Sequence, residues 1–141
     1  MEKIFADTKV GRKNIGLGIV QFLILGVLAG IPLTVDLFGG SWLTSEQYQT
    51  WKVLHAYAVF GAFVNFFLGY CIDRVKLSNR EKEISSWSFA IAGLVGGFGR
   101  AALFMLAMWY APYSYAASLI ETVGFVLGTF VFVRGLLNEQ R

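Results

Sequence analysis

Four polar side chains lie within long apolar runs of this sequence, and each belongs to a residue type that can do chemistry. His55 is the only histidine in the chain, and it stands in the run LHAYAVFGAFVN, which also holds Asn65. Arg100 and Glu121 lie in two further apolar runs. A neutral imidazole can ligate a metal or a heme iron, an amide can orient a polar group, and a guanidinium can hold an anion. What these residues do depends on the elements that position them.

The composition indicates that these elements lie in a membrane. Of 141 residues, 56% are hydrophobic and only 15% are charged, and the mean hydropathy is +0.59. A soluble domain of this length has too much surface for its volume to bury so large an apolar area. The lipid bilayer is therefore the solvent for much of the chain. The net charge of +3 lies at the ends of the apolar segments, so we expect no nucleic-acid partner.

Four apolar segments are long enough to cross a hydrocarbon core of about 30 Å at about 1.5 Å per helical residue. They lie near residues 15–37, 53–72, 86–110 and 113–134. We therefore expect a single all-α domain over residues 1–141, a bundle of four transmembrane helices integral to the cell (inner) membrane. Lysine and arginine are concentrated before the first segment, between the second and third, and after the fourth. The positive-inside rule then predicts that both termini and the middle loop are cytoplasmic.

Local signals predict where several of these helices begin and end. Residues 44–47 (TSEQ) and 78–81 (SNRE) have the spacing of capping boxes, so the second and third helices are expected to begin there, outside the apolar core. The pair Gly39-Gly40 is expected to end the first helix. A very short turn at residues 111–113 is expected to join the third and fourth helices.

The midpoint between the third and fourth helices is expected between residues 110 and 111. Arg100 and Glu121 lie at equal distances in sequence from that midpoint, so they are expected at the same depth in the bundle. Each also stands in a strip of small residues at helical spacing, which lets two helices approach closely. We therefore predict a buried ion pair between Arg100 and Glu121. Two roles are open: the pair fixes the register of the third and fourth helices, or Arg100 binds an anionic group such as a heme propionate or a substrate.

His55 is expected about one helical turn inside the outer boundary of the membrane. Its face of the second helix is small and aromatic, and wide enough for a flat macrocycle. That face carries Trp51, Val59, Ala62 and Phe66. His55 is thus a candidate axial ligand of heme iron, either five-coordinate or shared between subunits, because one histidine excludes a bis-histidine site within one subunit. The alternative is an interfacial histidine bonded to Asp36.

Asn65 and Gln21 are expected at similar depth on neighbouring helices. Most buried amides of this kind bond one helix to another; the other interpretation gives Asn65 a catalytic role. The sequence has no C-x-x-C-H motif, which excludes covalent c-type heme attachment, and it has no phosphate loop or nucleophile–base arrangement.

Three short motifs, one in each of the first three predicted helices, are distributed over most of the chain. They are the spacing Gly26-x-x-x-Gly30 in the first helix, the histidine that opens the second in Lys52-Val53-Leu54-His55-Ala56, and the run Ala92-Gly93-Leu94-Val95-Gly96-Gly97 in the third. This layout resembles the small four-helix membrane family that contains styrene oxide isomerase and hydroxylaminobenzene mutase. The resemblance implies that His55 is the axial ligand of a b-type heme at the interfaces of a trimer. It also implies that the ferric iron acts as a Lewis acid on an epoxide oxygen.

The sequence departs from the family's pattern at several site positions. The family places an asparagine six residues after its histidine, and this chain has Gly61 there, with Asn65 about one helical turn further on. At the acidic and tyrosine positions of the family's third helix, this chain has Ala92 and Arg100. The resemblance therefore supports a heme ligand more directly than it supports epoxide isomerisation.

Together these observations favour a membrane-embedded homo-oligomer that binds heme b through His55 and isomerises a small lipophilic substrate without net electron transfer. Asn65, Arg100 and Glu121 are the candidate catalytic residues. The alternative is a non-catalytic small membrane subunit of a larger respiratory, transport or oxygenase complex, whose small-residue strips would be partner interfaces. A sensor or electron-transfer subunit has less support, because the chain lacks a second histidine.

Overall fold

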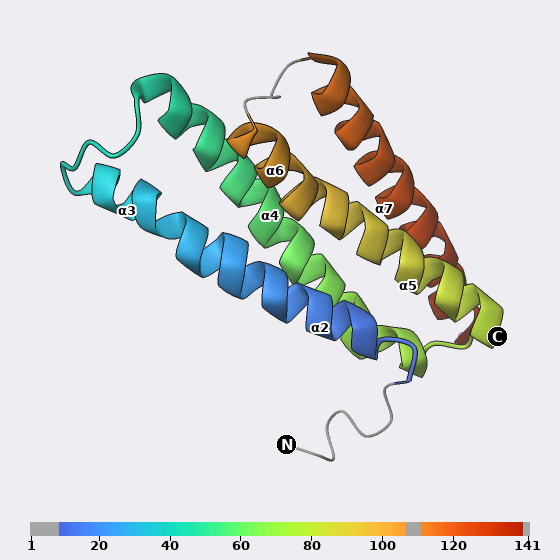
Figure 1. The fold of residues 1–141 in the computed structure, drawn as a ribbon. Coiled ribbons are helices and arrows are strands. Elements are labelled where there is room, and N and C mark those ends of the chain that lie inside the picture. Colours follow the sequence, from blue (N-terminus) through green and yellow to red (C-terminus); the bar gives the residue numbers. More distant parts are fainter. Residues whose placement is uncertain (1–8, 107–110, 140–141) are drawn as a thin grey trace.

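The computed structural model describes residues 9–106 and 111–139, and this part of the chain folds into an all-helical bundle (Figure 1). Within it, four helical segments are long and apolar enough to cross a membrane: Arg12–Leu37, Ser45–Arg74, Asn79–Met105 and Tyr115–Asn138. The predicted all-α membrane architecture is confirmed. The second and third segments extend several residues beyond their apolar spans at the N-terminal end, where their caps lie.

The first span is not one regular helix. It consists of the α-helix α2 (Arg12–Gln21), a π-helical turn η1 (Phe22–Val27), a short 3₁₀ turn η2 (Leu28–Gly30) and the α-helix α3 (Ile31–Leu37). Pro32 accounts for the break, because proline has no N–H and its ring collides with the carbonyl four residues earlier in a regular α-helix. The Gly39-Gly40 pair ends the span as predicted, with Gly39 at a φ of +89°.

The second and third spans begin at the predicted capping boxes. Helix α4 (Ser45–Cys71) follows the reciprocal bonds between Thr44 and Gln47, and it continues into the 3₁₀ turn η3 (Ile72–Arg74). Helix α5 (Asn79–Leu94) follows the same bonds between Ser78 and Glu81. The third span then passes through a π-helical turn η4 (Val95–Gly99) into α6 (Arg100–Met105).

The residues predicted to form the turn between the third and fourth spans are helical in the structure. Helix α6 ends at Met105 and helix α7 runs over Ala111–Glu139, so the expected turn at residues 111–113 is wrong. Proline in the first turn of a helix lacks only an N–H that has no intrahelical partner there, so Pro112 fits the start of α7 as well as it fits a turn. Residues 107–110, the end of the third predicted span, lie outside the described part of the chain.

Neighbouring spans in the sequence are also neighbours in space: the first span packs on α4, α4 on α5, and α5 on α7 (Figure 1). Between α2 and α4 the backbones themselves touch. A Cβ on Gly18 would lie 2.6 Å from the carbonyl oxygen of Ala62, and a Cβ on Gly69 would lie 2.6 Å from that of Gly11. Small residues therefore set the spacing of these two helices, as is typical of membrane bundles.

One end of the bundle gathers the start of the first span, the α4–α5 connection and the end of α7. There Lys13 pairs with Glu83, and Arg134 pairs with Glu81 at 3.2 Å. We call this the basic end, defined by residues 9–13, 73–82 and 134. The opposite end carries the Gly39-Gly40 turn.

Candidate functional site

His55 is held by a backbone carbonyl of the first span. Its Nδ1 lies 2.8 Å from the carbonyl oxygen of Leu25. A carbonyl oxygen only accepts hydrogen bonds, so Nδ1 donates, and in the neutral imidazole Nε2 then keeps its lone pair. Nε2 has no hydrogen-bond partner within the described part of the chain. Metal-ligating histidines usually have this arrangement, in which the second ring nitrogen donates to a carbonyl.

The irregular part of the first span supplies this carbonyl. Leu25 lies in the π-helical turn η1, and Ala29, in the 3₁₀ turn η2, accepts a second bond of 2.8 Å from the indole Nε1 of Trp51. Trp51 and His55 are one helical turn apart on α4, so two side chains of one face reach two carbonyls of the facing span. Gly30 lies against the imidazole, where a Cβ would be 3.1 Å from the His55 Cε1.

A groove of about 380 Å³ adjoins His55 between the C-terminal half of the first span and α4. Most of its lining is apolar, and the exceptions are Thr34, Tyr48 and His55. Thr34 donates to the carbonyl of Gly30 at 3.1 Å, whereas the Tyr48 hydroxyl has no partner among the described residues. The groove is lined by Gly26, Val27, Gly30, Ile31, Leu33, Thr34, Val35, Leu37, Tyr48 and His55.

The face that the sequence predicts for a macrocycle is divided by the first span. Trp51 and His55 border the same narrow space, beside Ala58 and Ala101. Val59 packs beside Gly26. Ala62 and Phe66 line a separate apolar hollow of about 230 Å³ with Gly18, Ile19, Phe22, Leu23 and Phe63. The close approach at Gly18 is the physical reason, because it places the first span directly across that face of α4.

The predicted alternative partner of His55 is wrong. The carboxylate of Asp36 accepts from the backbone N–H groups of Trp42 and Leu43 at 2.8 and 3.2 Å. Asp36 therefore closes the loop after the first span, while His55 donates to the carbonyl of Leu25.

The predicted ion pair between Arg100 and Glu121 is confirmed. Nη2 of Arg100 lies 2.5 Å from Oε2 of Glu121, and it also donates to the Ser118 hydroxyl at 3.0 Å. Both charged residues are 5% exposed, and the Arg100 guanidinium lies 4.3 Å from the centroid of the Tyr57 ring. Nη1 of Arg100 is buried without a partner among the described residues. Since Tyr57 points away from His55 on α4, the ion pair and His55 lie on different sides of that helix within one chain.

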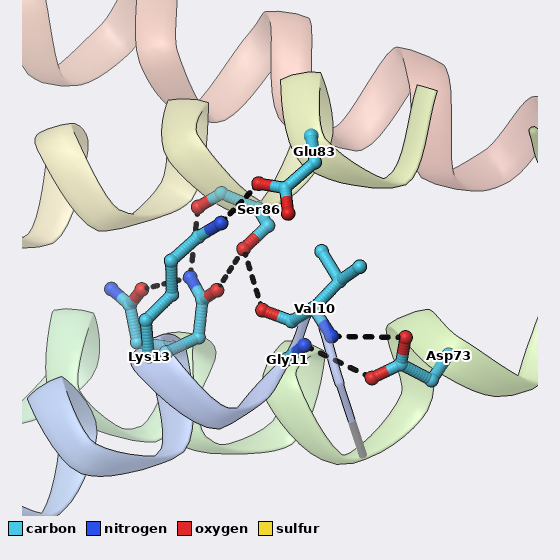
Figure 2. A network of polar contacts seen from close by, with 8 residues as sticks. Val10, Gly11, Lys13, Asp73, Glu83 and Ser86 are labelled. Atoms are coloured by element: carbon cyan, nitrogen blue, oxygen red, sulfur yellow. Dashed lines mark hydrogen bonds and ion pairs between the residues drawn. The ribbon is translucent and has the colours of Figure 1, made fainter. Parts of the chain in front are cut away.

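Asn65 belongs to a third group, near the basic end. Its Nδ2 donates to the carbonyls of Gly61 and Phe89, each at 3.0 Å, and its Oδ1 accepts from Asn14 at 2.8 Å. Asn14 also bonds Ser86, so the network joins α2, α4 and α5 (Figure 2). These contacts support the interpretation of Asn65 as an interhelical link, because both of its amide hydrogens are occupied.

Three polar residues that take part in holding the bundle were not singled out for that role in the sequence. Asn14 and Ser86 complete the Asn65 network, and the Asp73 carboxylate accepts from the backbone N–H groups of Val10 and Gly11 at 3.2 and 3.0 Å (Figure 2). Asp73 thereby satisfies free donors at the start of the first span. The seven-residue spacing of Asn14 and Gln21 is a signal that was available, since it puts two amides on one helix face.

The donor set around His55 is restricted. In the described part of the chain, no group of three or more His, Cys, Asp or Glu side chains is arranged to hold a metal ion. Among these residues His55 is therefore a candidate ligand by itself, not as a member of a metal-binding cluster.

A comparison with protein families matches residues 10–137 to the family described as styrene oxide isomerase. The chain belongs to the styrene oxide isomerase family. Neither a curated protein nor a solved structure matches it. The match confirms the resemblance read from the motifs of the first three helices, and it covers His55, Leu25 and the Arg100–Glu121 pair. Family membership makes the chain an isomerase-like membrane protein.

Proposed function

We propose that this family member binds heme b through Nε2 of His55 and isomerises a small lipophilic substrate in the membrane. One observation carries the proposal: His55 donates through Nδ1 to the Leu25 carbonyl and keeps a lone pair on Nε2 beside a groove. This tautomer is the one that an axial imidazole ligand needs.

The residues present fit such a group. Heme brings four nitrogen ligands of its own, so a single imidazole suffices from the chain, and the described residues offer no competing donor cluster. The groove is mostly apolar, and Gly30 keeps space open against the imidazole ring. Tyr48, seven residues before His55 on the same face of α4, presents a hydroxyl that can bond a propionate or a substrate oxygen.

When bound, a heme with one protein ligand supplies a Lewis-acidic iron with an open position that can polarise a substrate oxygen. The chain does the rest. His55 donates its lone pair while the Leu25 carbonyl fixes the ring, and the apolar wall of the groove excludes water. Because the groove lies within the spans, a lipophilic compound can enter it from the bilayer. An isomerisation leaves substrate and product with the same atoms and electrons, so no redox partner is required.

The proposal includes a homo-oligomer, with a trimer as the state that the family resemblance implies. Helix α4 presents the His55 groove on one side and Tyr57, which covers Arg100, on another. Copies that pack these two different sides together form a heterologous interface, which closes into a ring for a suitable rotation. In that arrangement Tyr57 of one subunit would border the groove of the next, with the Arg100–Glu121 ion pair buried directly behind it as part of the site.

We place the chain in the cell membrane with the basic end in the cytoplasm. The cations of that end, among them Arg12, Arg74 and Arg80, support this orientation through the positive-inside rule. The N-terminal start of the first span and the end of α7 meet there, so both termini would be cytoplasmic.

The second candidate is a non-catalytic membrane subunit of a larger complex. The observation in its favour is that Arg100 and Asn65 are bonded within the chain, as purely structural groups would be. Gly61 and Ala92, which replace polar residues of the family pattern, favour it as well.

The visible absorption spectrum separates these two candidates. Full-length protein would be produced in a host supplied with heme, purified in lipid nanodiscs and compared with His55→Ala, with Tyr115→Phe, at a tyrosine of α7 that is 73% exposed, as the control variant. The proposal predicts a Soret band at one heme per chain that is lost in His55→Ala and kept in Tyr115→Phe. A folded, colourless wild-type protein would leave the non-catalytic subunit as the better account.

A further inference from the structure

The break in the first span aligns two backbone carbonyls with one face of α4. The carbonyls of Leu25 and Ala29 lie in consecutive irregular turns, and each accepts a side-chain N–H from α4 at 2.8 Å. Since π and 3₁₀ turns depart from the regular bond ladder, their carbonyls are more readily directed toward a neighbouring helix.

Trp51 is held by ring packing as well as by its hydrogen bond. Its indole ring stacks at a tilt on Phe104, with 5.1 Å between centroids, and it packs against the buried cluster of Leu25, Ala58 and Ala101. A large ring fixed on two sides keeps its N–H in one direction. The bond to Ala29 therefore ties the irregular turn to α4 one helical turn from His55.

We propose that Trp51 is a positioning residue for His55. Its bond to the Ala29 carbonyl holds the irregular turn at the distance where the Leu25 carbonyl accepts from Nδ1. The imidazole then stays in the Nδ1–H tautomer, with the lone pair of Nε2 left for a ligand. Gly30 completes the arrangement, because its missing side chain leaves room for the ring in this orientation.

The consequence for an iron ligand rests on the proposed function, but the positioning itself does not. A protein without heme should already hold His55 in one tautomer. Because the chain has one histidine, labelling with ¹⁵N-histidine gives the signals of a single imidazole, and those signals distinguish the Nδ1–H from the Nε2–H form.

The experiment uses full-length protein from a heme-deficient host in lipid nanodiscs. Wild type should show one pair of imidazole ¹⁵N signals, with Nδ1 protonated. Trp51→Phe removes the indole N–H and keeps an aromatic ring, and it should add a second pair from the Nε2–H form. Trp42→Phe is the matched control, since Trp42 is 64% exposed, and it should leave the spectrum unchanged. A Trp51→Phe spectrum identical to wild type would overturn the proposal.

A second pair of variants keeps the test decisive if Trp51→Phe does not fold. Gly30→Ala places a methyl 3.1 Å from the imidazole and should shift both ring nitrogens, whereas Gly16→Ala, which meets nothing within 4 Å, should not. An unchanged imidazole signal in Gly30→Ala would contradict the arrangement. A single Nδ1–H form in a protein that never binds heme would support the positioning role and refute the proposed function, so the two failures are distinguishable.

Discussion

Arg100 and Glu121 form a buried ion pair between α6 and α7, with Nη2 of the arginine 2.5 Å from Oε2 of the glutamate. The carboxylate lies over Gly96, where a side chain would collide with it. Opposite charges at this depth in a bundle neutralise each other, since neither would be stable alone against hydrocarbon. The pair is thus a constraint on how the third and fourth spans dock.

The first prediction concerns this pair. Arg100→Leu and Glu121→Leu should each lower the free energy of unfolding by about 3–5 kcal/mol, because each leaves an uncompensated buried charge. The double variant should cost at least about 1 kcal/mol less than the sum of the singles. Unfolding in detergent by heat or denaturant measures all three.

Arg134→Leu is the control for the ion pair. Arg134 is largely exposed in its pair with Glu81, so its removal should cost about 0–1 kcal/mol. Strict additivity of the Arg100 and Glu121 variants would show that the two charges do not interact.

The second prediction concerns Asn65. Asn65→Leu removes the donors to the Gly61 and Phe89 carbonyls and the acceptor for Asn14. Each buried group left without a partner costs about 1–3 kcal/mol, so the melting temperature should fall clearly. Asn138→Leu, at an exposed asparagine near the end of α7, should leave it nearly unchanged. Retained stability in Asn65→Leu together with lost turnover would instead show Asn65 to be catalytic.

The third prediction concerns the contact of α2 with α4. A Cβ on Gly18 would meet the backbone of Ala62 and Phe66 at 2.6 and 2.8 Å, and a backbone cannot move aside as a side chain can. Gly18→Ala should therefore destabilise the bundle by about 1–3 kcal/mol. Gly16→Ala, in the same helix but facing open space, should not. Equal thermal stability of the two variants would contradict the close approach.

Much of the fold could be predicted from local signals in the sequence. The capping boxes at residues 44–47 and 78–81 and the glycine stop at residues 39–40 act within one helical turn, so the chain alone reveals them. The Arg100–Glu121 pair could be predicted because charge and depth in the membrane leave few partners. The turn predicted at Pro112 was wrong, because proline suits the first turn of a helix as well as a connection.

The contacts of His55 could not be predicted from the sequence, because they depend on the backbone path of another helix. Its partner is a backbone carbonyl, which every residue has, and the choice of Leu25 depends on where the first span breaks and how it crosses α4. The apolar run predicts one continuous helix over residues 15–37, and Pro32 within it does not specify which carbonyls a break would direct toward His55. The same crossing separates Ala62 and Phe66 from His55, and no residue pattern within α4 could show it.

The central claim is that Nε2 of His55 ligates heme iron, and chemical rescue tests it most directly. Full-length His55→Gly would be titrated with ferric heme in nanodiscs, with and without added imidazole, and followed by its absorption spectrum. The account predicts that the wild-type Soret band is lost in His55→Gly and restored when imidazole occupies the space of the missing side chain. A Soret band that persists in His55→Gly without imidazole, or wild-type protein that takes up no heme, would contradict it.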